Sequence, residues 1–157
     1  MSVVVRRAST VDAELLSSMH AEIQAMHAAA VPSWFKPPGP DTFPPDSAAA
    51  LIGKTASLVF IAEIDRTPVG YAYAEVVHQP ETPWRHAHDM LYLHQIAIRE
   101  GHRRKGAGAA LLAAIRLDAD SRGLELIALD VWTFNEEARA FFACQGFMPY
   151  TERMWLR

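Results

Sequence analysis

The strongest constraint on the fold is a strand, a cationic loop and a helix that follow one another directly. Apolar side chains recur between Met90 and Ile98 and predict a buried strand. The stretch HRRKGAG follows at positions 102–108, and a helix is predicted from Gly106 to Arg122, with Gly123 as its C-terminal stop. Such a strand-loop-helix unit is typical of α/β domains.

The remaining elements alternate in the same way. Strands are predicted at Val3 to Arg7, Leu58 to Ile64, Val69 to Val77, Leu124 to Trp132 and Thr151 to Leu156. Helices are predicted from Thr10 to near Ala30, from Ser47 to Thr55, and from Asn135 to Gly146, with Thr10 and Asn135 as caps. Six of the ten prolines lie in residues 32–45 and predict a loop packed on the core. This order, with an antiparallel hairpin at 58–77, predicts an α/β domain with a mixed sheet.

Composition limits the function classes. A chain of 157 residues, half of them apolar, has the length of one domain that buries roughly 70% of its unfolded surface. The chain carries 15 Lys and Arg against 18 Asp and Glu, which argues against a broad basic surface for nucleic acid. Neither a signal peptide nor a membrane-spanning apolar run is apparent, so a cytoplasmic protein is expected. Cys144 is the single cysteine, which excludes an intrachain disulfide and a cysteine metal cluster.

The HRRKGAG stretch predicts a site for a large anion. A helix N-terminus offers unpaired N–H groups and a partial charge of about +0.5. Gly106 and Gly108 remove side chains that would hold a phosphate away from the backbone, and Arg103, Arg104 and Lys105 add charge-assisted hydrogen bonds. The alternative is an ordinary helix start flanked by solvated cations.

Two other phosphate-binding patterns fit poorly. A Walker loop requires G-x-x-x-x-G-K-[ST], which the chain lacks. A dinucleotide fingerprint requires G-x-G-x-x-G or Ala, and Leu111 stands at its third small position. Asp130 lies near the distance expected of a ribose-binding acid, but the preceding strand ends too early, at Ile98.

Two motifs together resemble the GNAT superfamily of N-acetyltransferases. Residues 103–108, RRKGAG, are similar to the R-x-x-G-x-G or Ala loop that binds the pyrophosphate of coenzyme A in that family. Residues 135–147, NEEARAFFACQGF, are similar to its N-x-x-A-x-x-F-Y-x-x-x-G-F segment. Because the two motifs stand in the family's order and the opening strand, helix and hairpin also fit, the resemblance covers nearly the whole chain.

This resemblance implies one N-acetyltransferase domain over residues 1–157, with acetyl-CoA as co-substrate. The implied fold is a mixed, mostly antiparallel central sheet flanked by helices, with parallel strands splayed at the cofactor site. The residues implied to bind the cofactor are the strand backbone of Ile96, Ala97 and Ile98, the loop residues Arg103, Arg104, Lys105, Gly106, Ala107 and Gly108, and Asn135 and Phe142. A plain helix cap is an equally good interpretation of Asn135.

The chain departs from the family at Phe142, where members commonly place a tyrosine that protonates the departing thiolate. A phenyl ring has no proton to give, so water or another group would serve, and the thiolate of coenzyme A is itself a tolerable leaving group. Tyr92, Tyr150 and Cys144 are candidate donors, and the sequence singles out none of them. For Cys144 the alternative is a small buried side chain without a catalytic role.

The strand before the loop often carries the family's general base, and His94 and Gln95 occupy that place here. Imidazole suits this task because it titrates near neutral pH. Adjacent strand residues point to opposite faces, so only one of the two is expected to face the cleft. A structural histidine is the alternative, and Glu75 on the second hairpin strand is a further candidate base.

Aromatic residues in the loops are predicted to frame the pocket for the acetyl acceptor. These are Trp34 and Phe35 in the proline-rich loop and Trp84 in the loop before the buried strand, with core packing as the alternative. The stretch HAHD at 86–89 alternates potential metal ligands, but no further ligand is evident, so no metal site is predicted.

The favoured function is transfer of an acetyl group from acetyl-CoA to a primary amine of a small molecule or a peptide, by direct attack on the thioester. The alternative is a non-catalytic acyl-CoA-binding regulatory module, which the missing tyrosine would suit. Neither a nucleic acid nor a membrane is expected as a partner. The exposed apolar surface of a small sheet domain is compatible with a homodimer.

Overall fold

Consecutive strands lie side by side in one mixed sheet, in the order β1-β2-β3-β4-β5. The computed structural model describes residues 1–157. The strands are β1 (Val3–Arg7), β2 (Ser57–Ile64), β3 (Thr67–Gln79), β4 (His88–Ile98) and β5 (Ile127–Leu129). Strands β1 to β4 pair antiparallel, and β4 and β5 pair in parallel. The structure confirms a single α/β domain with a mixed, mostly antiparallel sheet.

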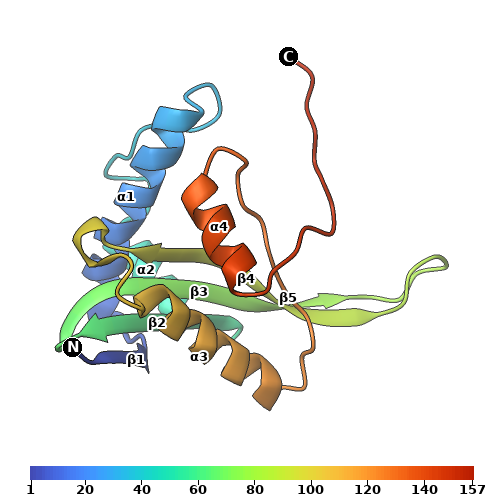
Figure 1. Ribbon diagram of the computed structural model, residues 1–157, viewed down its shortest axis with the longest axis horizontal. Coiled ribbons are helices and arrows are strands. Elements are labelled where there is room, and N and C mark those ends of the chain that lie inside the picture. The colour runs from blue at the N-terminus through green and yellow to red at the C-terminus, as the bar shows by residue number, and fades with distance from the viewer.

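Helices cover both faces of this sheet. They are α1 (Ala13–Ala30), α2 (Pro45–Gly53), α3 (Ala107–Ser121) and α4 (Glu136–Cys144), with short 3-10 turns η1 (Thr10–Asp12) and η2 (Glu100–His102). Helices α1 and α2 share one hydrophobic cluster with the sheet, and α3 and Phe142 of α4 belong to the cluster on the other face. Figure 1 shows α3 lying across the sheet, and α1 and α4 lying next to each other.

Strand β2 lies between β1 and β3 and has helices on both faces. Leu58, Phe60 and Ala62 belong to the α3 cluster, whereas Val59 and Ile61 belong to the α1 and α2 cluster. Each fully buried aliphatic side chain stabilises the fold by roughly 1.5–3 kcal/mol. A strand that is covered on both faces needs an uninterrupted apolar run, which explains the sequence of β2.

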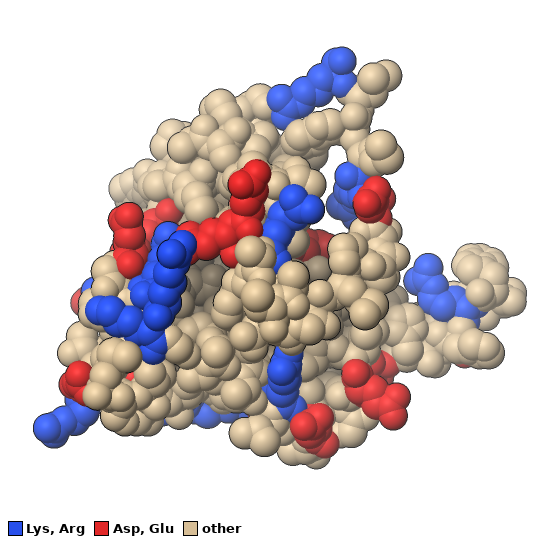
Figure 2. Space-filling view, viewed as in Figure 1, with Lys and Arg blue, Asp and Glu red and all other residues tan.

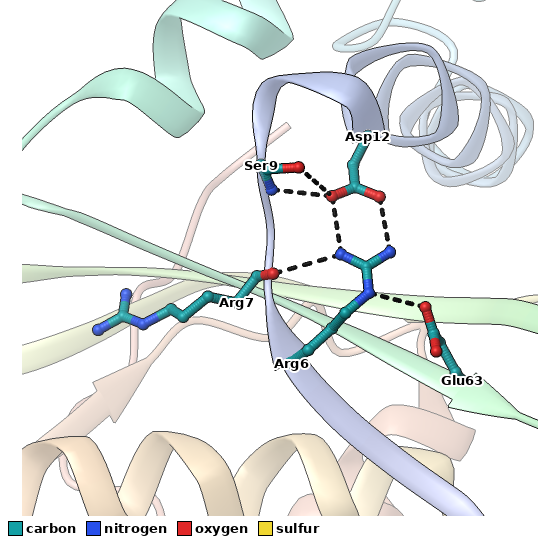
Figure 3. Close-up of polar contacts among 5 residues, drawn as sticks. All are labelled: Arg6, Arg7, Ser9, Asp12 and Glu63. Carbon is teal, nitrogen blue, oxygen red and sulfur yellow. Dashed lines mark hydrogen bonds and ion pairs between the residues drawn. The ribbon is translucent and has the colours of Figure 1, made fainter. Parts of the chain in front are cut away.

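The start of α1 is fixed to the sheet by an ionic network. The Arg6 guanidinium donates two hydrogen bonds to the Asp12 carboxylate, at 2.8 and 2.9 Å, and one to Glu63 at 2.7 Å (Figure 3). The Ser9 amide also donates to Asp12, at 2.8 Å. The bonds from Arg6 hold the pKa of Asp12 below its usual range. Ser9, and not the predicted Thr10, therefore stands at the cap, since Thr10 lies inside η1.

The predicted boundaries of the helices are largely confirmed. Helix α1 ends at Ala30, and α3 and α4 agree with their predicted limits to within a few residues. Helix α3 turns one face to the sheet and buries Ala107, Leu111, Leu112, Ile115 and Ala119. Helix α2 begins two residues before Ser47, because Pro45 fits the first turn of a helix, where no amide hydrogen is needed.

Three strand predictions are corrected. The loop before the buried strand is shorter than predicted, because the β3–β4 ladder continues as far as the pair of Gln79 with His88 and leaves residues 80–87 as the loop. Strand β5 keeps only three of the nine predicted residues, because it lies at the edge of the sheet and β4 is its single neighbour. Residues 151–156 form no strand at all, since no strand lies beside them. None of the helices combines the length and apolar character needed to cross a membrane.

Candidate functional site: the open edge of β4 and the loop before α3

The parallel strands β4 and β5 separate after a short paired region. Their pairing joins Leu91, Tyr92 and Leu93 to residues 127–129 and then stops. Strand β4 continues to Ile98, so its last five residues have β3 on one edge and no strand on the other. Ile96, Ala97 and Ile98 lie in this part of β4. The parallel pairing therefore ends early, and the last five residues of β4 keep one edge without a strand, which agrees with the splayed parallel strands that the family resemblance implied.

The loop before α3 presents a run of backbone amides that have no partner. Arg104 and Gly106 adopt left-handed conformations, with φ of 58° and 87°, and α3 begins at Ala107. The six amides from Arg104 to Ala109 donate to no acceptor in the protein. Alternating backbone conformations of this kind, directly before a helix, form a concave anion-binding site.

The cations of this loop are exposed and only weakly engaged. Arg103 donates to the Ile98 carbonyl at 3.2 Å and to Glu137 of α4 at 3.3 Å, and Lys105 donates to the Gly101 carbonyl at 3.0 Å. Figure 2 shows basic side chains gathered over the start of α3, with acidic side chains next to them. An exposed ion pair contributes about 0–1 kcal/mol. Arg103 can therefore exchange Glu137 for a bound anion at little cost.

The two glycines of the loop have different roles. A Cβ at Gly106 would meet no atom within 4 Å, so the positive φ of this residue, and not a lack of space, is the reason for glycine there. At Gly108 a Cβ would lie 3.1 Å from Cζ of Phe141 in α4. This glycine therefore lets α3 and α4 pack closely, and its role beside a phosphate stays a prediction.

His94 occupies a bulge in β4. The register pairs Tyr73 with Gln95 and Ala74 with Leu93, which leaves His94 as the extra residue. The His94 ring stacks on Tyr73 at a centroid distance of 4.7 Å, and the Gln95 amide oxygen accepts a 2.6 Å hydrogen bond from Tyr71. Tyr71 and Tyr73 lie on one face of β3, so His94 and Gln95 both face that side. The expectation that only one of them would do so is wrong, because the bulge interrupts the alternation.

Four side chains from β3, β4 and the segment after β5 form a continuous group, here called the polar row. Its members are Glu75, His94, Tyr92 and Asp130. The His94 Nε2 lies 3.4 Å from the Glu75 carboxylate, and the rings of His94 and Tyr92 are 4.9 Å apart. The Tyr92 hydroxyl donates a 2.6 Å hydrogen bond to Asp130 just beyond β5. The imidazole thus lies between two carboxylates, in direct contact with one and one tyrosine away from the other.

Hydrogen bonds keep Glu75 ionised. The Tyr73 hydroxyl donates a short hydrogen bond to Glu75, and Lys54 donates another at 3.2 Å. The hydrogen bond from Tyr73, followed by that from Lys54, lowers the pKa of Glu75, although burial opposes this shift. Burial and the bond to Glu75 raise the pKa of Tyr73. The carboxylate beside His94 is therefore negatively charged at neutral pH.

Asn135 and Phe142 have structural roles in α4. The Asn135 side chain accepts a hydrogen bond from the Ala138 amide at 3.1 Å, so it is a helix cap. It also lines an open cleft of about 570 Å³ between the end of α1 and the start of α4, together with Met26 and Phe134. Phe142 is buried against Phe147. Cys144 is exposed, contrary to its interpretation as a small buried residue.

The predicted acceptor-pocket aromatics do not come together. Trp34 and Phe35 join an aromatic group centred on Trp132, with ring centroids 5.9 and 5.3 Å from it. Trp84 is 81% exposed near the tip of the β3–β4 hairpin, which projects from the body of the protein (Figure 1). The difference arises because the hairpin ladder continues far beyond the sheet and carries Trp84 away.

The HAHD stretch does not assemble a metal site. No group of three or more His, Cys, Asp or Glu side chains is arranged to hold a metal ion. Asp89 instead pairs with His78 across the hairpin at 2.8 Å, and His86 is fully exposed near Glu81.

Tyr73 and Trp132 contact candidate site residues and were not predicted from the sequence. Tyr73 lies between Tyr71 and Glu75 at the two-residue spacing of a strand, and that alternation was a signal that could have placed all three on one face of β3. Trp132 carried no such signal, because it lies beyond the end of β5 in irregular backbone.

Comparisons with known proteins agree with this geometry. Residues 23–147 match the model of the acetyltransferase (GNAT) family. The BH1408 protein from Bacillus halodurans, in a tetramutant form, has a similar structure, with a TM-score of 0.93, 22% identity and coverage of 98% of this chain and 99% of that one. No curated protein matches the chain in a sequence search.

Two acetyltransferase structures are also similar. The aminoglycoside N-acetyltransferase AAC(6')-Iy in complex with CoA has a TM-score of 0.75 at 18% identity and covers 99% of this chain and 94% of its own. A ribosomal-protein-alanine N-acetyltransferase from Brucella melitensis biovar Abortus 2308 has a TM-score of 0.74 at 20% identity, with 99% of each chain covered. At these identities the likeness shows a shared fold. The family match, which spans most of the sequence, shows that the chain belongs to the acetyltransferase (GNAT) family.

Proposed function

We propose that the protein transfers an acetyl group from acetyl-CoA to a primary amine of a small molecule or a peptide. The observation that carries this proposal is the run of six unpaired amides from Arg104 to Ala109, placed beside the open edge of β4. Such a run of amides suits a pyrophosphate, and an open strand edge suits an extended amide-containing arm.

The residues present fit coenzyme A. The loop amides, with Arg103, Arg104 and Lys105, would hold the pyrophosphate, and the backbone of Ile96 to Ile98 would pair with the pantetheine arm. Asn135 would contact the arm from the cleft wall that it already lines. When bound, acetyl-CoA supplies a thioester whose acetyl group an amine can attack.

His94 is the best candidate for the general base. Its Nε2 lies 3.4 Å from the ionised Glu75 carboxylate, which stabilises the imidazolium that forms when His94 accepts a proton. The imidazole is about one third exposed, so an amine or a bridging water can reach it. The Gln95 amide oxygen accepts a hydrogen bond from Tyr71, so Gln95 would help to position this part of β4 rather than accept a proton.

The surroundings of His94 favour a cationic acceptor. Glu75 and Asp130 supply negative charge on either side of the imidazole, and Trp132, two residues after Asp130 along the chain, packs with Trp34 and Phe35. Carboxylates and aromatic faces both attract ammonium groups. The named activities of two similar structures, on aminoglycosides and on a ribosomal-protein alanine, are both acetylations of amines.

A non-catalytic acyl-CoA-binding module is the second candidate, and Phe142 favours it. The ring is buried and has no proton to give to a departing thiolate. In the catalytic proposal the thiolate leaves without a protein acid, or takes its proton from water. Turnover of acetyl-CoA with a panel of primary amines distinguishes the two candidates.

The first experiment is a thermal-unfolding titration with acetyl-CoA, with adenosine diphosphate and NAD as controls. A ligand at 100 times its Kd adds about 2.7 kcal/mol, which should raise the Tm by roughly 5 to 10 degrees. A selective rise with acetyl-CoA is expected. No rise at saturation would contradict the assignment of the loop and remove the main support for acetyl transfer.

A further inference from the structure

The side chain of Lys54 places a primary amine of the protein itself beside the candidate base. The Lys54 Nζ donates a 3.2 Å hydrogen bond to Oε1 of Glu75. The other oxygen of the same carboxylate, Oε2, lies 3.4 Å from the His94 Nε2. One carboxylate therefore separates this ammonium group from the imidazole. The proposed reaction requires an amine next to His94, and Lys54 already occupies such a place.

The backbone holds Lys54 on the side of the sheet that carries the candidate base. Lys54 directly follows α2, and its carbonyl accepts a hydrogen bond from the Ser57 amide at 3.1 Å. Ile52 of α2 packs against the same hydrophobic cluster as Tyr73 and Ala97. Ala97 belongs to the part of β4 proposed to pair with the pantetheine arm. The end of α2 and that part of β4 therefore share one side of the sheet.

The amine of Lys54 is accessible and weakly held. Its side chain is 61% exposed, and an exposed ion pair contributes about 0–1 kcal/mol, so the amine can leave Glu75 at little cost. The chain has three lysines, Lys36, Lys54 and Lys105, and all of them are exposed. Only Lys54 pairs with a carboxylate, since Lys105 donates to a backbone carbonyl. The other two lysines are therefore internal controls for the chemistry at Lys54.

We propose that Lys54 is a self-acetylation site, which receives an acetyl group from acetyl-CoA bound to the same chain. The inference rests on the proposed function, because it uses the same cofactor site and the same base. It adds a modification site to that function, with a lysine of this chain as the acceptor amine.

The transfer needs no group beyond the site, the thioester and water. The Lys54 ammonium gives one proton to His94, and the neutral Nζ then attacks the carbonyl carbon of the acetyl thioester. A C–N bond forms and the C–S bond breaks. The nitrogen loses a second proton to water, and the thiolate leaves with the electron pair and takes a proton from water. The products are acetyl-lysine, coenzyme A and one released proton.

The first test follows acetylation of the full chain by peptide mass spectrometry, during incubation with acetyl-CoA and no added amine. Lys54 should be acetylated at least about tenfold faster than Lys36 or Lys105, because positioning in the site accelerates the first reaction alone. Its first-order rate constant should not change with protein concentration, since the amine and the cofactor site belong to one chain. Equal rates at the three lysines, or a rate constant that rises with protein concentration, would overturn the proposal.

Three variants separate catalysis from spontaneous acetylation. His94→Ala should lower the Lys54 rate to that of Lys36, whereas His78→Ala on the β3–β4 hairpin should leave it unchanged. Lys54→Arg keeps a cation beside Glu75 but should show no acetylation at this position, because a guanidinium stays protonated. A Lys54 rate that survives His94→Ala would mean that the site does not catalyse the transfer, and would also overturn the proposal.

A panel of primary amines, assayed in parallel, distinguishes this inference from the proposed function. If the panel is acetylated and Lys54 is not, only this inference fails. If acetyl-CoA produces no rise in Tm, the proposed function fails and this inference fails with it.

The second test measures proximity without turnover. In a Cys144→Ala background, Lys54→Cys carries a thiol at this position, and bromoacetyl-coenzyme A is the probe. The thiolate displaces bromide and forms a thioether. The Lys54→Cys chain should be labelled at least about tenfold faster than Lys36→Cys in the same background, and excess acetyl-CoA should slow the labelling of the first alone. Equal and unprotected labelling of the two chains would show that the acyl group does not reach position 54, and the proposal would be wrong.

Discussion

The loop before α3 and the polar row form the two halves of the candidate site in different ways. The loop works through consecutive backbone amides from Arg104 to Ala109, whereas the polar row assembles side chains of Glu75, Tyr92, His94 and Asp130 from three segments. The loop depends on local backbone conformation and the row depends on strand register. Changes in the loop should therefore alter cofactor affinity, and changes in the row should alter turnover.

The largest effect is expected at His94. His94→Ala should lower kcat/KM for the amine by about 100- to 10,000-fold, the range for loss of a general base. The Kd for acetyl-CoA should stay unchanged, because His94 lies outside the loop. Steady-state kinetics and calorimetric titration measure the two quantities separately.

The control for this variant is His78→Ala, which removes an exposed histidine from the β3–β4 hairpin. It should have wild-type kinetics. If His94→Ala also keeps wild-type turnover, His94 is structural and the polar row is not the catalytic half of the site.

Gly108→Val should have the next largest effect, and it tests the loop. The valine side chain would meet Phe141, so unfolding free energy should fall by about 1–3 kcal/mol, and acetyl-CoA should bind more weakly because the start of α3 shifts. Chemical denaturation and calorimetry give the two values. In Gly108→Val/Phe141→Leu, stability should partly recover. Wild-type affinity for acetyl-CoA in Gly108→Val would argue against the loop as the cofactor site.

Gly106→Ala should have a smaller effect of a different origin. The positive φ of 87° costs a residue with a Cβ about 1–2 kcal/mol. Relaxation of this strain would turn the amides away from one another, so weaker binding of acetyl-CoA is expected at unchanged kcat. Gly53→Ala, at the end of α2 and in open space, is the matched glycine control and should be neutral or slightly stabilising. Equal effects of the two substitutions would contradict a special role for Gly106.

The loop half of the site could be predicted from the sequence, because its determinants are neighbours along the chain. Short stretches of sequence determine the strand, the positions of the glycines and the start of α3. The same holds for the N-cap at Asn135 and for Gly123, which ends α3. The close approach of Phe141 to Gly108 could not be predicted in this way, since the two residues are distant in sequence.

The polar row could be predicted only in part, because it depends on pairing between distant segments. The bulge that brings His94 and Gln95 to one side is a property of the β3–β4 register. No residue type in β4 indicates where such a bulge occurs. The missing strand at 151–156 has the same cause. Its pattern is that of a strand, but in the structure it lies beside no strand, and the pattern of side chains alone does not say whether a segment pairs.

The smallest effect is expected for Tyr73→Phe, which tests whether the Tyr73 hydroxyl keeps Glu75 ionised. The ring stays stacked on His94, but the hydrogen bond that most lowers the Glu75 pKa is lost. A lowered carboxyl pKa contributes stability above the usual value of about 4.3 and loses it as pH falls through the lowered value. At pH 7 the variant should therefore be less stable by about 1 kcal/mol. Urea unfolding should show this difference shrinking in acid, and a difference that is the same at both pH values would mean that Tyr73 acts on packing and not on the charge of Glu75.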